Sequence, residues 1–277
     1  MLYHVSIFVI ILGLCVGSFL NVVTFRLPRG LSIVYPRSSC PKCGKKLDWY
    51  ELIPVFSWIF ICKTKCRGCY SNISPIYPLV ELLTSTLFLL NLNSVPTSFN
   101  QYGENYIVFS GVILIIFLIP LIFIDLEYLI LPDSIIYPGI IVGFLLRNLG
   151  LILSDSFQVL LNLLITFTAL FLIVVTVSFL NFISSNVFAK DSIGMGDAKL
   201  FLMNFVWLGI SGLEISLILS FLSAGLVSIL GLIFKLFKRG QYIPFGPFIS
   251  LSFFLVWLLG EDFWISTLKN LLWWRYL

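Results

Sequence analysis

The sequence predicts an all-α polytopic membrane protein with about eight transmembrane helices. Of its 277 residues, 59% are hydrophobic and only 11% are charged, and the mean hydropathy is +1.05. A soluble domain needs a charged, wettable surface, which this composition does not supply. The apolar residues also gather in runs of about 20, the length that crosses a bilayer. We therefore expect the chain to cross the membrane repeatedly.

Eight apolar segments have this length or nearly so. They are residues 5–25, 76–92, 105–124, 135–153, 158–182, 198–210, 214–234 and 246–260. The sixth and the eighth are short for a span. The first is expected to stay in the protein as a membrane helix, because residues 1–6 carry no Lys or Arg, unlike the start of a cleavable signal peptide.

Basic residues predict the orientation of these segments. If the N-terminus lies outside, 14 of the 17 Lys and Arg residues fall on the cytoplasmic side. This distribution agrees with the enrichment of cytoplasmic loops in basic residues. The net charge of +4 then mainly reflects the basic cytoplasmic loops, and it also attracts anionic membrane lipid. No basic patch interleaved with aromatic residues points to a nucleic acid.

The largest extramembrane segment, residues 26–75, contains two Cys-x-x-Cys pairs. Cys40 and Cys43 form the first, and Cys66 and Cys69 follow after 22 intervening residues. Four thiolates in two such turns suit tetrahedral zinc, and four protein ligands leave no position for water, so the zinc is expected to be structural. The alternative is two disulfides, which a reducing cytoplasm disfavours. A domain of about 50 residues has a small core, so a metal would supply part of its folding energy.

Elimination leaves carboxylates as the candidate catalytic groups. The single histidine, His4, rules out a His-Glu-x-x-His zinc site and places no histidine beside a serine nucleophile. No glycine-rich dinucleotide or phosphate loop is present. Two acids stand at the edges of apolar runs, Asp125 and Asp197, where an ionised carboxylate costs roughly 2.5–3.5 kcal/mol.

The predicted topology places Asp125 and Asp197 at the same membrane depth, although they are 72 residues apart in sequence. Two carboxylates about 4 Å apart repel by roughly 4 kcal/mol, so such a pair shares one proton. The ionised member can activate a water while the protonated member polarises a peptide carbonyl. This chemistry is that of an aspartic protease.

Gly194-Met195-Gly196-Asp197 would let the backbone bend and approach a peptide closely. The alternative is a flexible loop in which Asp197 is the N-cap of the next helix. Asp133, which follows Pro132, is likewise expected to be an N-cap, with a supporting role in the site as the alternative.

These motifs, taken in order along the chain, closely resemble the type IV prepilin peptidases. The resemblance covers nearly the whole length and is carried by Gly17-Ser18-Phe19-Leu20-Asn21-Val22-Val23, Arg26-Leu27-Pro28, the four cysteines, Glu51-Leu52-Ile53-Pro54, Ser57-Trp58, Ile73-Ser74-Pro75, Tyr77-Pro78-Leu79-Val80-Glu81, Ile124-Asp125, Leu131-Pro132-Asp133, Gly194-Met195-Gly196-Asp197 and Pro244-Phe245-Gly246-Pro247. The spacing between the two acids is somewhat longer here than in other members.

The resemblance implies a bifunctional enzyme of the bacterial inner membrane that serves pilus, type II secretion or competence systems. It would cleave the basic leader of a type IV prepilin or pseudopilin after a glycine, on the cytoplasmic side. It would then methylate the new N-terminus with S-adenosylmethionine. By matching positions, Asp125 and Asp197 are the catalytic pair, and Cys40, Cys43, Cys66 and Cys69 are the zinc ligands.

Glu51 and Glu81 are weaker candidates for contacts in the methylation step. The resemblance suggests that they hold the new ammonium group or assist its methylation, whereas Glu81 could instead extend to the membrane interface. Pro244-Phe245-Gly246-Pro247 either punctuates a helix or forms a re-entrant wall of the substrate groove. The expected organisation is a first helix (1–25), a cytoplasmic cysteine domain (26–75), a peptidase core (76–262) and an interfacial aromatic tail (263–277).

Other functions that share some of these features are a presenilin-like intramembrane protease, a proton- or ion-coupled transporter with a zinc docking domain, and a pilin-binding assembly subunit. The cysteine segment speaks against the first. The second would place its acids along a through-going pore.

Overall fold

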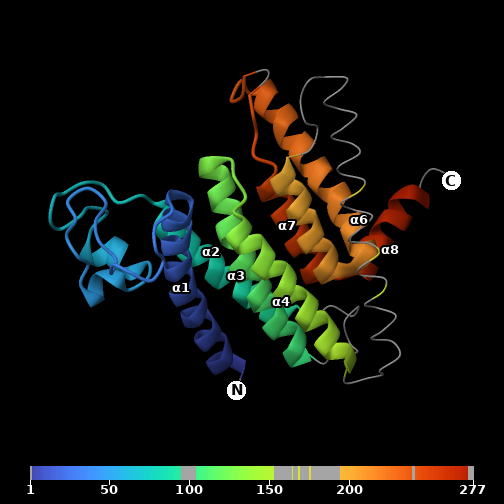
Figure 1. The fold of residues 1–277 in the computed structure, drawn as a ribbon, viewed down its shortest axis with the longest axis horizontal. Helices are drawn as coiled ribbons and strands as arrows, with labels where there is room; N and C mark the ends of the chain where they lie inside the picture. Colours follow the sequence, from blue (N-terminus) through green and yellow to red (C-terminus); the bar gives the residue numbers. More distant parts are fainter. Residues whose placement is uncertain are drawn as a thin grey trace. The chain divides into compact units, whose positions relative to one another are not determined.

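The computed structural model describes residues 2–94, 104–152, 194–238 and 241–273, with Leu164, Thr168 and Val175 between them. Among these residues the regular secondary structure is helical, and strand-like pairing is limited to two isolated bridges (Figure 1). The predicted all-α class is therefore confirmed. The chain divides into two compact units, which are described separately. They are Met1–Ser94 with Gly111–Ile124, and Val95–Ser110 with Asp125–Leu277.

The helices begin and end close to the predicted apolar segments. They are α1 (Leu2–Arg26), α2 (Ile76–Asn93), α3 (Glu104–Tyr128), α4 (Asp133–Ile152), α6 (Met195–Ile233), α7 (Gly246–Leu259) and α8 (Glu261–Trp273). Four of the described helices are long and apolar enough to cross a membrane, and α7 with α8 forms one further bent candidate. The predicted span at 158–182 lies outside the described residues, apart from the three single positions.

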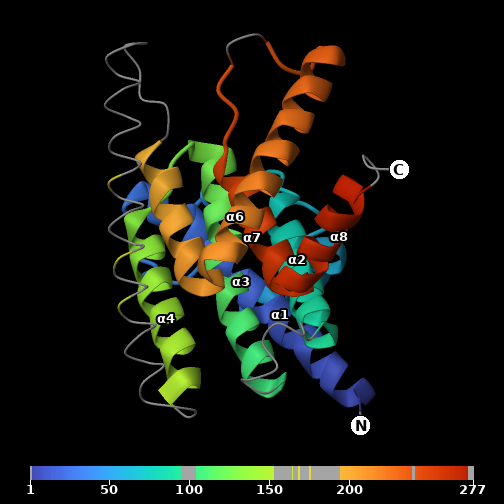
Figure 2. The ribbon, with the colours of Figure 1, turned by 90° about the vertical axis from the view of Figure 1, so that its right-hand side faces the viewer.

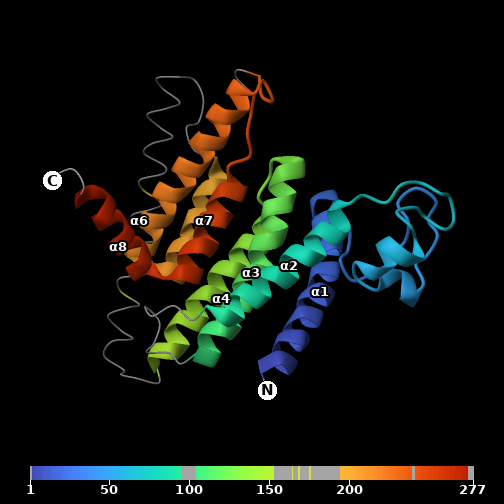
Figure 3. The same ribbon diagram turned by 180° about the vertical axis from the view of Figure 1, so that it is seen from behind.

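Helices α1 and α2 pack tightly in the first unit (Figure 3). Gly13 and Gly17, four residues apart on α1, both face α2. A Cβ atom at Gly13 would lie 2.5 Å from Ser85 Cα, and one at Gly17 would lie 2.7 Å from Glu81 Cα. Small residues at this spacing let two membrane helices approach through their backbones. The pair is further joined by a hydrogen bond that the Ser85 hydroxyl donates to the Ile10 carbonyl, at 3.1 Å.

This close approach makes Gly13 sensitive to a single methyl group. We expect Gly13→Ala to lower stability by about 1–3 kcal/mol, because the added Cβ would overlap the α2 backbone. The measurement is the thermal unfolding temperature of the detergent-solubilised protein. Gly225→Ala is the control, since a Cβ at that helical position meets no atom within 4 Å. An equal change in both variants would contradict the close packing.

The segment between α1 and α2 lies beside the adjoining ends of these two helices (Figures 1 and 3). It contains three short helical turns, η1 (Leu27–Arg29), η2 (Trp49–Leu52) and η3 (Ser57–Ile61). Glu51 anchors η2 through a capping box, in which its carboxylate accepts the Asp48 N–H at 2.9 Å. This predicted cytoplasmic segment is thus ordered by local turns and by contacts within the first unit.

In the second unit, α6 turns back on itself at Gly209, so that its two parts run in opposite directions (Figure 2). Gly209 has a φ of +86°, a conformation that disfavours residues with a side chain. The sequence predicted two separate spans here, 198–210 and 214–234, and the break falls within the end of the first. Where a helix is interrupted in this way, other groups must form hydrogen bonds with the backbone N–H and C=O groups that lose their helical partners.

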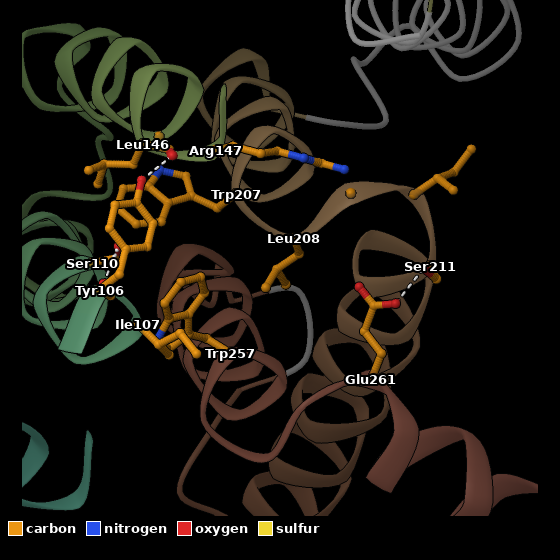
Figure 4. Close-up of a pocket in the computed structure, with 13 residues that line it drawn as sticks. Tyr106, Ile107, Ser110, Leu146, Arg147, Trp207, Leu208, Ser211, Trp257 and Glu261 are labelled. Carbon is orange, nitrogen blue, oxygen red and sulfur yellow. Dashed lines mark hydrogen bonds between the residues drawn. The ribbon is translucent and has the colours of Figure 1, made fainter. Parts of the chain in front are cut away.

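Two charged side chains lie at this break (Figure 4). The Arg147 guanidinium donates to the carbonyls of Phe205 and Val206 at 3.4 and 3.5 Å, and so satisfies the end of the first part of α6. Glu261, at the start of α8, accepts the Ser211 hydroxyl at 2.5 Å at the beginning of the second part. A cavity of about 280 Å³ lies between these groups. Arg147 and Glu261 thus provide hydrogen bonds at the break in α6, as irregular backbone within a membrane requires.

Candidate active site and candidate metal centre

The four cysteines of the two Cys-x-x-Cys pairs converge in the first unit. Cys40 Sγ lies 3.9 Å from Cys69 Sγ, and Cys43 Sγ lies 3.9 Å from Cys66 Sγ. All four sulfur atoms are within 4.8 Å of one another. Tetrahedral zinc with Zn–S bonds of about 2.3 Å needs sulfur separations of about 3.8 Å. The donor set and its spacing therefore fit one zinc ion.

The two cysteine pairs are held by turns of the same shape. Gly44 N–H donates to the Cys40 carbonyl, and Tyr70 N–H donates to the Cys66 carbonyl, both at 2.9 Å. An isolated antiparallel bridge closes each turn. Such turns direct two sulfurs and several backbone N–H groups toward the same point. Local backbone geometry thus brings the two sulfurs of each pair together.

At Cys40 and Cys69, hydrogen bonds favour the thiolate form that a metal requires, whereas the neighbouring sulfurs raise the pKa of Cys43. Burial raises the pKa of Cys40, but the N–H groups of Cys43 and Lys42 outweigh this effect and lower it to about 6. The hydroxyl and backbone N–H of Ser71 lower the pKa of Cys69. Among the described residues, Cys62 lies outside the four-sulfur cluster.

Asp125 and Asp197 both belong to the second unit. Asp125 lies one turn before the end of α3 and is 6% exposed, and Asp197 lies in the first turn of α6. Their carboxylates are close enough to interact electrostatically. Asp125 Oδ2 accepts the N–H of Gly246 at 2.9 Å, a bond that joins residues 121 positions apart. Leu131 lies beside both Gly246 and Gly196, so the segments that carry the two acids and Gly246 are close together.

Glycine is required where the third segment meets Asp125. A Cβ atom at Gly246 would lie 2.7 Å from Asp125 Oδ2 and 3.1 Å from Leu131 Cδ2. Leu131 also contacts Gly196, whose Cβ would lie 3.0 Å from Leu131 Cβ. The glycines beside the two acids thus allow backbone and side chains to pack where a larger residue would displace a carboxylate.

The alternative interpretation, in which Asp197 is the N-cap of α6, is wrong. The N-cap is Gly194, and no side chain caps the helix. Asp133 stands in the first turn of α4, and both its oxygens accept bonds from the Lys199 ammonium, at 2.7 and 2.9 Å. The carboxyl groups of Asp197 and Asp133 therefore have different environments. That of Asp197 lies beside Asp125, and that of Asp133 joins the starts of α4 and α6.

Glu51 and Glu81 are both buried in the first unit, with 6% and 7% exposure, and both line a cavity of about 400 Å³. The Glu51 carboxylate forms an ion pair with Lys45 at 3.2 Å. Glu81 Oε2 accepts the Val55 N–H at 2.7 Å. Cys40 and Cys66 also line this cavity, so it adjoins the cysteine cluster.

Comparison with known proteins places the chain in a family. The model of the bacterial peptidase A24 N-terminal domain matches residues 11–95, and that of the type IV leader peptidase family matches residues 112–235. The prepilin leader peptidase/N-methyltransferase of Neisseria gonorrhoeae is 31% identical over 288 residues, which cover 95% of this chain and 92% of that protein. The chain belongs to the type IV leader peptidase family.

Two further relatives carry the same name. The protein of Aeromonas hydrophila is 31% identical over 288 residues, which cover 95% of this chain and 94% of that protein. The protein of Myxococcus xanthus (strain DK1622) is 40% identical over 200 residues, which cover 72% of this chain and 54% of that protein. This last match thus spans about half of that relative's length. The search of solved structures found no match.

In this leader peptidase family member, sequence reasoning missed three contacts around the acids. They are the Gly246 N–H bond to Asp125, the packing of Leu131 against the site glycines, and the Lys199–Asp133 ion pair. A signal for the first was present in Pro244-Phe245-Gly246-Pro247, which we expected either to punctuate a helix or to form a wall of the site. The structure places Gly246 of this motif against Asp125.

Proposed function

We propose that Asp125 and Asp197 are the catalytic pair of a membrane aspartic endopeptidase that cleaves the leader peptide of type IV prepilin-like proteins. The observation that carries this assignment is the bond from the Gly246 amide to Asp125, together with the packing of Leu131 against both Gly246 and Gly196, the residue before Asp197. The enzyme then methylates the new N-terminus of the cleaved protein. The activities named for its relatives, leader peptidase and N-methyltransferase, support both steps.

In the proposed mechanism the two carboxyl groups hold one proton between them. The ionised member takes a proton from a water molecule, and the protonated member donates a hydrogen bond to the scissile carbonyl. The Gly246 N–H fixes one oxygen of Asp125, which orients that carboxyl group before the substrate binds. Glycines beside the acids leave room for an extended peptide.

The zinc ion is proposed to be structural. Cys40, Cys43, Cys66 and Cys69 would hold it, and four thiolates leave no open position for water. When bound, the metal stabilises a domain whose own core is small. Hydrolysis therefore depends on the carboxylates.

The active site is proposed to face the cytoplasm, with the N-terminus outside. Basic residues support this orientation because they concentrate in residues 26–75 and 235–240. In this arrangement residues 26–75 form the cytoplasmic four-cysteine domain, residues 76–262 the peptidase core, and residues 263–277 an aromatic tail at the outer interface. The substrate, a prepilin or pseudopilin, would be cleaved on the cytoplasmic side.

Mass spectrometry of a type IV prepilin coexpressed with this protein tests both activities at once. The expected product lacks its basic leader and carries one additional methyl group, 14 mass units, at its new N-terminus. An unprocessed prepilin would overturn the proposal. Proton flux in liposomes without cleavage would favour a transporter, and cleavage within a substrate's transmembrane helix would favour a presenilin-like protease; the comparisons favour neither.

The Gly246 contact predicts a large effect from one methyl group. We expect Gly246→Ala to lower kcat/KM for leader cleavage by about 10²-fold, because the new Cβ would push the Asp125 carboxylate from its position. Cleavage of a synthetic prepilin peptide in detergent measures this. Gly225→Ala is the matched control in the same unit. Equal rates for the two variants would contradict a role for the Gly246–Asp125 contact.

A further inference from the structure

The cavity of about 400 Å³ in the first unit is large enough for a small molecule, since ligand pockets span about 300–1,000 Å³. Its wall comes from the end of α1, the start of α2 and the segment between them. The wall combines aromatic side chains, such as Trp58 and Tyr77, with acidic and basic ones. This mixture is unlike a gap between packed membrane helices and matches a site for a polar, partly cationic ligand.

The two acids of this wall, Glu51 and Glu81, differ in whether a cation of the protein neutralises their charge. Glu51 has a cation of its own, Lys45, and its second oxygen accepts the Asp48 N–H. Its charge is therefore compensated within the protein, and its contacts explain its position as the anchor of η2. Glu51 needs no ligand to account for its burial.

Glu81 lacks such a cation. Its contacts are the Val55 N–H, at 2.7 Å, and the Ser18 hydroxyl. No Lys or Arg of the described residues forms an ion pair with it, although only 7% of the residue is exposed. A carboxylate in so buried a position is costly unless a positive charge faces it. The cavity beside Glu81 is where a cationic ligand could supply that charge.

Other groups of the wall match the remaining parts of a methyl donor. Aromatic rings attract a cation through their faces, and Trp58 is held in place by a bond from its indole N–H to the Ile73 carbonyl. Arg26 offers a guanidinium, the preferred partner of a carboxylate. S-adenosylmethionine carries a sulfonium and a carboxylate, and this wall offers a carboxylate and aromatic rings for the first and Arg26 for the second.

We propose that this cavity binds S-adenosylmethionine and that the Glu81 carboxylate faces its sulfonium. The proposal rests on the methyltransferase activity proposed above and assigns that activity a place in the chain. It separates Glu81, which contacts the donor, from Glu51, which positions the wall. In the transfer, a nitrogen–carbon bond forms while the carbon–sulfur bond breaks, sulfur keeps the electron pair as a neutral thioether, and the amine releases one proton to the solvent.

Ligand binding to the full-length, zinc-loaded enzyme in detergent tests this site. Isothermal titration calorimetry would compare S-adenosylmethionine with S-adenosylhomocysteine, which lacks the sulfonium charge. We expect the wild-type enzyme to prefer the charged ligand, and Glu81→Gln to weaken its binding by about tenfold or more while changing the binding of S-adenosylhomocysteine much less. Unchanged binding of S-adenosylmethionine to Glu81→Gln would overturn the proposal.

Two further variants separate charge from structure. Glutamine at position 81 can still accept the Val55 N–H, whereas Glu81→Asp keeps the charge but shortens the reach to that amide. If the carboxylate only holds the Val55 N–H, Glu81→Asp would bind S-adenosylmethionine more weakly than Glu81→Gln does. That result would contradict the proposal. If it faces the sulfonium, Glu81→Asp should keep more of the preference than Glu81→Gln. Asp133→Asn, in the other unit, is the control and should retain the preference because Asp133 does not line this cavity.

Zinc content and thermal unfolding of each variant show whether it has folded. The prepilin mass spectrum of the wild-type enzyme shows separately whether methylation occurs. An absence of methylation would overturn the proposed function, whereas methylation together with unaltered donor binding by Glu81→Gln would overturn only the site assigned here.

Discussion

Asp125→Asn and Asp197→Asn are each expected to abolish leader cleavage. Asparagine has nearly the size of aspartate, and its side-chain oxygen can still accept the Gly246 N–H at position 125, so folding should persist. It can neither take nor give up a proton, and removing such an acid–base group costs about 10²–10⁴-fold in rate. Cleavage of a prepilin in reconstituted membranes, with zinc content as the folding check, provides the measurement.

Asp133→Asn is the matched control for this experiment. Asp133 is a nearby acid of the same unit, but its carboxylate is paired with Lys199 and is half-exposed. We expect this variant to lose less than about tenfold of the cleavage rate, as is usual for a surface ion pair. Full activity in either the Asp125 or the Asp197 variant would remove the two-acid mechanism. Equal losses in all three would indicate a shared structural defect instead.

The helical class and the positions of most helices could be predicted from the sequence because both depend on local properties. Apolar runs of about 20 residues identify spans by length alone. The close packing of α1 on α2 was missed, although Gly13 and Gly17 carry the known small-residue spacing, because apolarity does not distinguish a lipid-facing glycine from one at a helix contact. The reversal at Gly209 was predicted only as a gap between the segments 198–210 and 214–234.

The same distinction applies to the candidate sites. Spacing identifies the zinc ligands Cys40, Cys43, Cys66 and Cys69. The two cysteines of each pair come together within a single turn, so only the two turns have to meet in space. The Gly246–Asp125 bond and the Glu81 cavity depend on segments far apart in the chain meeting in space. Spacing along the sequence carries no information about such contacts. The sequence could therefore name candidate acids but could not separate Glu81 from Glu51.

The largest effect on stability is expected from the cysteine cluster. Cys43→Ser removes one of four thiolates, and a serine hydroxyl is a poor replacement because it stays protonated at neutral pH. Zinc binding of this kind contributes about 10–16 kcal/mol to the folding of small metal domains, so the loss of one ligand should release most of the metal. Zinc content measured by mass spectrometry, together with the unfolding temperature in detergent, checks this.

Methylation should suffer at least as much as cleavage in Cys43→Ser. The proposed donor cavity shares Cys40 and Cys66 with the cysteine cluster, so unfolding of the cluster removes part of its wall, whereas the two acids lie in the other unit. Cys62→Ser is the control, since Cys62 lies between the two pairs but outside the four-sulfur cluster, and it should keep its zinc. An undiminished zinc stoichiometry in Cys43→Ser would contradict the four-ligand site. If Cys43→Ser lost more cleavage than methylation, the metal domain would be more important for the structure around the two acids than for the donor cavity.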